Sequence, residues 1–135
     1  MSGVDGLTTN YYCDALCEMV FHDATQMPTV ESDAQQINKN RHVGNDFVQV
    51  IWSEHWRDYD VGRTTPHSSV GTIKSQVPHA HIVIYPLPNG LFRVQIFKRG
   101  FVAHFGPLQH SMTVTKQLLP LLVRQVRCSI IRRLR

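Results

Sequence analysis

Three runs of β-branched and aromatic residues limit what this 135-residue chain can fold into. Each run has the length and composition of a buried strand, and they cover residues 47–52, 80–85 and 91–97. The dipeptide Asn89-Gly90 lies between the last two runs and favours a tight turn, which predicts a hairpin there. Residues 17–22, after a loop over residues 1–12, fit a strand or one helical turn, and we assign them as a further strand of the sheet.

Two other segments have the pattern of helices. Residues 32–42 begin at a good capping residue and end before Gly44 and Asn45, which both tolerate a left-handed backbone. Residues 114–135 carry an apolar stripe at helical spacing, with Pro120 in the first turn or at a kink. The sequence therefore predicts an α/β fold in which one central mixed sheet, made of all four strands, is flanked by helices.

Charge is distributed unevenly along the chain. All ten acidic residues lie within residues 1–60 beside three basic ones, whereas residues 61–135 hold eleven basic residues and no acid. Such a division indicates two surfaces or a segment of a larger whole. No apolar stretch is long enough to span a membrane, and the first residues do not look like a secretory signal. Three cysteines are too few for a disulfide framework, which favours a reducing compartment and predicts a cytoplasmic protein.

Three groupings of residues suggest other chemistries. Cys13, Cys17 and His22 have a spacing only loosely suited to zinc, and because no fourth ligand is evident, no metal site is predicted. His79 and His81 would share a strand face, which alone does not make a metal site. The basic residues near the C-terminus lack a nucleic-acid fingerprint, so no nucleic-acid partner is predicted. Glycine-rich phosphate loops and serine-hydrolase elbows are also absent from the sequence.

The segment from Lys39 to Val48 has the most specific composition. It places Asn45 just past a predicted helix, with Lys39 and Arg41 before it, Asp46 after it and a strand next. A carboxamide combines one acceptor oxygen and two donor hydrogens on a planar group, which suits it to hold a water and a phosphate oxygen together. An asparagine after a helix is also an ordinary terminating residue, so the composition alone leaves both interpretations open.

Residues 32–46 resemble the catalytic segment of the Rap/Ral GTPase-activating protein family, which includes tuberin. The flanking segments resemble the same family. Residues 21–29 look like the family's strand that ends in Met-Pro or Leu-Pro, and several downstream segments look closest to the Ral-directed alpha subunit: residues 51–59, 82–86 and 105–108. The resemblance covers most of residues 6–127.

This resemblance implies a GTPase activator, not itself an enzyme, that acts on a small Ras-like GTPase of the Ral, Rap or Rheb class. In the family, an asparagine carried by a helix, the "Asn thumb", enters the nucleotide site of the GTPase and orients the attacking water. Asn45 matches the thumb, and the residues that match its supporting positions are His42, Gly44 and Asp46. Lys39 and Arg41 match basic residues expected to meet the GTPase.

The resemblance also implies a G-domain-like fold at residues 6–131, followed by a basic tail at 132–135, with the N-terminal part of the domain missing. It implies no cofactor, because GTP and Mg²⁺ belong to the GTPase, and it leaves open a heterodimer with a second GAP subunit. Asp23 stands where relatives carry an apolar strand residue, which costs stability if the carboxylate is buried without partners. Asn40 replaces a basic residue of many relatives, and residues 61–69 resemble an insertion.

Two alternative functions fit the same sequence. A non-catalytic chain of this fold would bind a GTPase, or scaffold a GAP complex, without raising GTP turnover. A basic α/β domain unrelated to GTPases would bind polyanions in a salt-sensitive way, and Asn45 would then be dispensable. The sequence does not select the target GTPase, because selectivity depends on surface residues outside the thumb segment.

Overall fold

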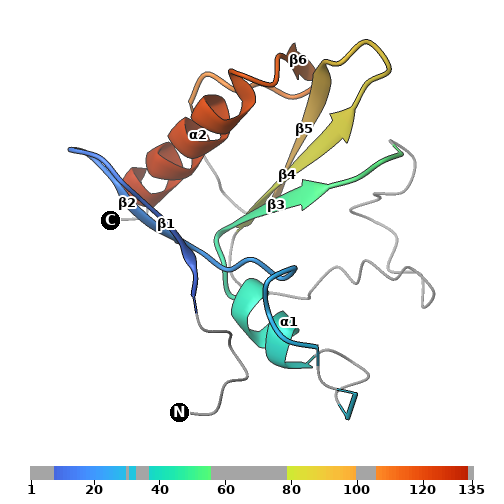
Figure 1. Ribbon diagram of the computed structural model, residues 1–135. Coiled ribbons are helices and arrows are strands. Elements are labelled where there is room, and N and C mark those ends of the chain that lie inside the picture. The colour runs from blue at the N-terminus through green and yellow to red at the C-terminus, as the bar shows by residue number, and fades with distance from the viewer. Residues whose placement is uncertain (1–7, 30, 33–36, 56–78, 100–105, 134–135) are drawn as a thin grey trace. The chain divides into compact units, whose positions relative to one another are not determined.

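The computed structural model describes residues 8–29, 31–32, 37–55, 79–99 and 106–133 (Figure 1). The chain divides into two compact units, Met1–Asp46 and Phe47–Arg135. The first contains β1 (Asn10–Cys13), β2 (Glu18–Phe21) and α1 (Ile37–Val43). The second contains β3 (Val48–Trp52), β4 (His79–Pro86), β5 (Phe92–Arg99), β6 (Met112–Val114) and α2 (Leu119–Arg133).

In the first unit, β1 and β2 form an antiparallel hairpin with Asn10 opposite Phe21 and Cys13 opposite Glu18. The carboxylate of Asp14 stabilises the turn by accepting 2.8 Å hydrogen bonds from the backbone N–H groups of Leu16 and Cys17. The strand predicted at 17–22 is therefore present, but its assignment to the central sheet is wrong. This strand, β2, pairs with β1 in a separate two-stranded sheet, and most of β1 lies in the segment predicted to be a loop.

The second unit is built on a four-stranded mixed sheet in the order β3-β4-β5-β6. The strands β3 and β4 are parallel, with Val48 opposite Ala80, whereas β4 and β5, and also β5 and β6, pair antiparallel. The predicted mixed sheet is thus confirmed for three of its strands. Its fourth strand is the short β6, which the sequence pattern did not reveal.

The hairpin predicted between β4 and β5 is confirmed. Its turn is closed by a hydrogen bond from the Gly90 N–H to the Leu87 carbonyl (3.0 Å), and the Asn89 side chain accepts from the Leu91 N–H (3.1 Å). Gly90 has a φ of 78°, a left-handed conformation that glycine adopts without the steric cost borne by other residues. Both residues of the Asn-Gly dipeptide therefore stabilise the turn.

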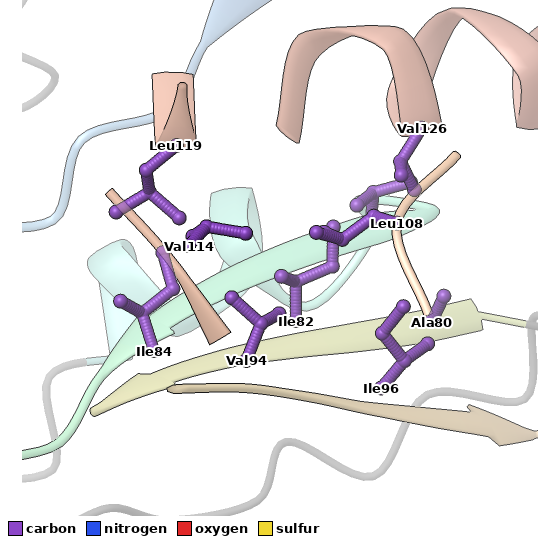
Figure 2. Packing of buried hydrophobic residues seen from close by; sticks show 10 residues of the cluster. Ala80, Ile82, Ile84, Val94, Ile96, Leu108, Val114, Leu119 and Val126 are labelled. Atoms are coloured by element: carbon purple, nitrogen blue, oxygen red, sulfur yellow. The ribbon is translucent and has the colours of Figure 1, made fainter. Parts of the chain in front are cut away.

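Helix α2 covers one face of this sheet and closes the hydrophobic core (Figure 2). Leu119 and Val126 of the helix pack with strand residues such as Ile82, Ile84 and Val94, as the predicted apolar stripe requires. The helix begins at Leu119, later than the predicted residue 114, because residues 112–114 pair with β5. Pro120 accordingly lies in the first turn, where its missing N–H costs nothing.

The strand β3 forms one edge of the sheet as far as the described residues show. Its side chains Val50 and Trp52 are about half exposed, at 47% and 57%, and the Trp52 ring lies 5.7 Å from that of Phe92. An apolar edge strand of this kind favours association with another strand or chain. No described helix is long and apolar enough to cross a membrane. The predicted insertion at 61–69 lies outside the described residues.

Candidate functional site

The segment that follows α1 carries the residues predicted to form the site. Helix α1 ends at Val43, and the chain continues in two tight turns. The Asn45 N–H donates to the His42 carbonyl (3.4 Å), and the Asp46 N–H donates to the Val43 carbonyl (3.2 Å). The helix ends before Gly44 and Asn45 as predicted, but neither residue is left-handed: the described residues with a positive φ are Gly90, Gly106 and Ser111. Bonds of the i→i+3 type tighten the spiral, so no left-handed residue is needed.

The Asn45 side chain is exposed and bonded to its own helix. Its Nδ2 donates to the Arg41 carbonyl at 2.9 Å, which satisfies one of the carbonyl groups left open at a helix C-terminus. The amide orientation follows from this contact, because a carbonyl can only accept. One donor hydrogen of the carboxamide is therefore used internally, and its Oδ1 and second hydrogen keep their bonding capacity. These two groups are what a water and a phosphate oxygen require.

Asp46, the residue after Asn45, is held by a histidine from the β1–β2 side of the unit. The Nδ1 of His22 lies 3.0 Å from Oδ1 and 3.1 Å from Oδ2 of Asp46. The ring of His22 also contacts that of His42, with centroids 5.5 Å apart and planes tilted by 51°. His42 is half-buried and Gly44 is buried. The three residues predicted to support the thumb thus lie beside Asn45, and His22 contacts two of them, His42 and Asp46.

The two basic residues predicted to meet a GTPase differ in their surroundings. Lys39 is half-buried, and its Nζ donates to the Thr29 hydroxyl at 2.8 Å. Arg41 is exposed, and its carbonyl accepts the Asn45 bond described above. The charge of Arg41 is therefore better placed to meet another molecule than that of Lys39, which takes part in holding α1 to the preceding loop.

Asp23 is not on a strand, because β2 ends at Phe21, so the expected cost of a buried strand carboxylate is avoided. Its Oδ1 accepts from the Thr25 hydroxyl (2.6 Å) and the Thr25 N–H (2.9 Å). The hydroxyl bond is the main reason why the pKa of Asp23 is lowered below its ordinary value. The aspartate thus stabilises a turn at the point where the chain leaves the hairpin.

A hollow of about 200 Å³ lies beside these residues in the first unit. Its lining residues are Thr8, Thr9, Val20, His22, Asp23, Gln26, Met27 and His42. Two of them, His22 and His42, also contact each other and flank the thumb segment.

The metal interpretation finds no counterpart in the described part of the chain, where no three His, Cys, Asp or Glu residues are placed to hold an ion. His22 faces Asp46, whereas the thiol groups of Cys13 and Cys17 lie near the backbone carbonyls of the residues that follow them. His81 is a buried strand residue, 2% exposed.

A family model described as Rap/ran-GAP matches residues 1–133. The chain belongs to the Rap/ran-GAP family. Among the relatives of this Rap/ran-GAP chain, Ral GTPase-activating protein subunit alpha-1 of Rattus norvegicus is 42% identical over 119 residues, or 88% of the chain. The tuberous sclerosis 2 protein homolog of Schizosaccharomyces pombe is 32% identical over 132 residues, or 91% of the chain. The chain spans 5% and 9% of the lengths of these two proteins.

The Rap/ran-GAP fold is also seen in a solved structure, that of the TSC2 GAP domain. The two share 28% sequence identity with a TM-score of 0.72, over 99% of this chain and 71% of the other. The family resemblance and the α/β fold are therefore confirmed. The domain bounds 6–131 stay a prediction, and α2 runs to Arg133, into the segment predicted as a basic tail.

Sequence reasoning missed His22 as part of this site. Its spacing from Cys13 and Cys17 suggests only a zinc ligand, although the segment 21–29 that resembles the family includes it. The feature that identifies His22 is its contact, at the end of a strand, with the acidic residue that follows Asn45. Such a pairing is visible only once β2 and α1 are brought together.

Proposed function

We propose that this chain is a GTPase-activating domain for a small Ras-like GTPase of the Ral, Rap or Rheb class, with Asn45 as the catalytic group supplied in trans. The observation that carries the proposal is the exposed Asn45 carboxamide at the end of α1. Its Nδ2 donates to the Arg41 carbonyl, and the Asn45 backbone N–H donates to the His42 carbonyl. Two similar proteins, a Ral GTPase-activating protein subunit and a TSC2 GAP domain, support the same class of function.

The chemistry of GTP hydrolysis fits this arrangement. The reaction needs little covalent help, so a protein accelerates it mainly by positioning the attacking water and stabilising charge. The bond from one amide hydrogen of Asn45 to the Arg41 carbonyl fixes the orientation of the carboxamide. Its Oδ1 can then accept from the water while the second hydrogen donates to a phosphate oxygen. A group fixed before the partner arrives pays little ordering entropy during the reaction.

The other predicted residues have supporting roles in this proposal. His42, Gly44 and Asp46 hold the thumb segment, and Arg41 meets the anionic surface of the nucleotide-loaded GTPase. Lys39 contributes more to the local structure, because it is bonded to Thr29. The domain needs no cofactor of its own, since Mg²⁺ and GTP come with the GTPase. A second GAP subunit is a further proposed partner, and the cytoplasm is the proposed place of action.

The test is single-turnover GTP hydrolysis by purified Ral-, Rap- and Rheb-class GTPases with and without the chain. We expect the chain to accelerate at least one of them and Asn45→Ala to remove that acceleration. A matched control is Gln109→Ala, which removes an exposed carboxamide from the other unit and should retain full stimulation. Equal stimulation by wild type and Asn45→Ala would exclude the thumb. Binding without stimulation by the wild type would favour the scaffolding alternative.

A further inference from the structure

The thumb segment is flanked on both sides by residues that touch one histidine. His42 precedes Asn45 in the chain and contacts the His22 ring, and Asp46 follows it and bonds to His22 Nδ1. His22 is 24 residues away from Asp46 along the sequence, so this contact joins two separate parts of the first unit. We propose that His22 is a positioning residue for Asn45, an inference that rests on the proposed function above.

The geometry of the contact suits positioning. His22 Nδ1 is almost equidistant from the two carboxylate oxygens of Asp46, at 3.0 and 3.1 Å. An ionised carboxylate only accepts hydrogen bonds, so Nδ1 must carry the hydrogen, which then points between both oxygens. This two-fold contact defines the orientation of the Asp46 carboxylate relative to the ring. The contact with the His42 ring restricts the orientation of the His22 ring from a second side.

His22 itself is supported from the hairpin. It follows Phe21, the last residue of β2, whose partner in the register is Asn10 of β1. The hydroxyl of Thr9 donates to the Phe21 carbonyl and so holds this strand end. A residue that directly follows a paired strand has a well-defined backbone position. The hairpin can therefore restrict the motion of the segment around Asn45 through His22.

The degree of exposure separates positioning from general stabilisation. The His22 and Asp46 side chains are 39% and 20% exposed. Ion pairs and hydrogen bonds at such partly solvated sites contribute little to global stability. Catalysis is more sensitive, because a small displacement of a catalytic group lowers the rate steeply. Loss of the contact should therefore loosen Asn45 and Asp46 without unfolding the chain.

Two matched substitutions test which ring nitrogen matters. The amide nitrogen of an asparagine takes the place of Nδ1, whereas that of a glutamine takes the place of Nε2. We expect His22→Ala and His22→Gln to speed hydrogen exchange of the Asn45 and Asp46 backbone amides about fivefold, and His22→Asn to restore slow exchange. The Leu122 amide, bonded to the Leu118 carbonyl in the other unit, is the internal control and should not change.

The kinetic consequence is measured on the same variants of the full chain. With saturating GTPase, we expect His22→Ala to lower stimulated kcat about tenfold with an unchanged KM, and His22→Asn to recover most of it. In a double-mutant cycle, His22→Ala and Asp46→Ala should be strongly non-additive. Unchanged amide exchange, additive effects, or equal behaviour of His22→Asn and His22→Gln would overturn the proposal.

The outcomes also separate this proposal from the proposed function. If Asn45→Ala abolishes stimulation and His22→Ala leaves kcat intact, only the positioning role fails. If Asn45→Ala has no effect, the thumb itself fails, whatever His22 does. The exchange measurement needs no GTPase, so it decides whether His22 holds the segment independently of the kinetic result.

Discussion

The two units of this chain maintain their structure by different means. Among the described residues of Phe47–Arg135, ten buried residues from the sheet, one loop and α2 form one continuous hydrophobic cluster (Figure 2). In Met1–Asp46, Met19 is the buried hydrophobic residue among those described, and side-chain hydrogen bonds organise the turns. Burial of apolar surface supplies most folding free energy, whereas exposed hydrogen bonds mainly define local geometry.

This difference explains where the candidate site lies. Asn45, its support residues and His22 all belong to the first unit, where small side-chain contacts set the position of one exposed group. Substitutions there should alter activity far more than stability. Substitutions in the core of the second unit should do the opposite.

The isosteric substitution Asn45→Asp should abolish stimulated GTP hydrolysis, lowering kcat on the order of 10²–10³-fold. A carboxylate keeps the acceptor oxygens but lacks the donors, and it faces the Arg41 carbonyl, which also only accepts. Thermal unfolding should change little. Single-turnover hydrolysis beside a melting curve checks both statements, and a large loss of stability would contradict the division between the units.

The substitution Ile82→Ala should destabilise the chain by about 2–5 kcal/mol. Ile82 is fully buried at the centre of the cluster between β4 and α2, so truncation leaves a cavity. Urea denaturation followed by circular dichroism measures the loss. At a low temperature at which the variant is still folded, its stimulated kcat should equal that of the wild type. A reduced kcat of the folded variant would show that the core also shapes the site.

The substitution Gly90→Ala should cost about 1–2 kcal/mol, because alanine is disfavoured at a φ of 78°. No atom lies within 4 Å of where the added Cβ would be, so a clash is not the cause. Gly90→Asn should cost less, since asparagine tolerates this conformation. Chemical denaturation of both variants compares them, and equal costs would contradict the conformational explanation.

The substitution Arg41→Ala should raise the KM for the GTPase several-fold, with little change in kcat. Lys39→Ala should raise KM less, because Lys39 is half-buried and bonded to Thr29. Added salt should weaken binding by the wild type more than binding by Arg41→Ala. Titration of the GTPase at two ionic strengths measures this difference. A larger effect at Lys39 would reverse the assignment of the docking charge.

The smallest expected effect is that of Asp23→Ala on stability. The bonds from Thr25 lower the pKa of Asp23. The ionised carboxylate is therefore more favoured in the folded chain than in the unfolded chain. This contribution is present near neutral pH and is lost as the pH falls below about 4 and through the lowered pKa. The difference in unfolding free energy between wild type and Asp23→Ala should therefore shrink on acidification, as denaturation at several pH values would reveal.

Much of the second unit follows from local sequence patterns. The strands β3, β4 and β5 were predictable because β-branched runs are selected by a buried, pleated surface. The hairpin was predictable because Asn89-Gly90 has few alternatives to a tight turn. The short β6 was not, since three residues are too few to show a period, and its pairing with β5 displaced the start of α2.

The segment around Asn45 stood out in the sequence, whereas His22 and the contacts of the candidate site did not. The order of Asn45 after a helix and before a strand is a local property, and so is the surrounding charge. Nothing local indicated that the Asn45 amide bonds to the Arg41 carbonyl. Gly44 and Asn45 both tolerate a left-handed backbone, but the helix satisfies its last carbonyls through tight turns instead.

The sequence by itself determined the class of elements, the hairpin, the apolar stripe of α2 and the thumb-like segment that ends in Asn45 and Asp46. Tertiary structure alone decided that residues 18–21 pair with residues 10–13, and that His22 meets Asp46. The reason is physical. Propensity and periodicity act over a few neighbouring residues, whereas pairing between distant segments depends on the competition among all partners that the folded chain offers.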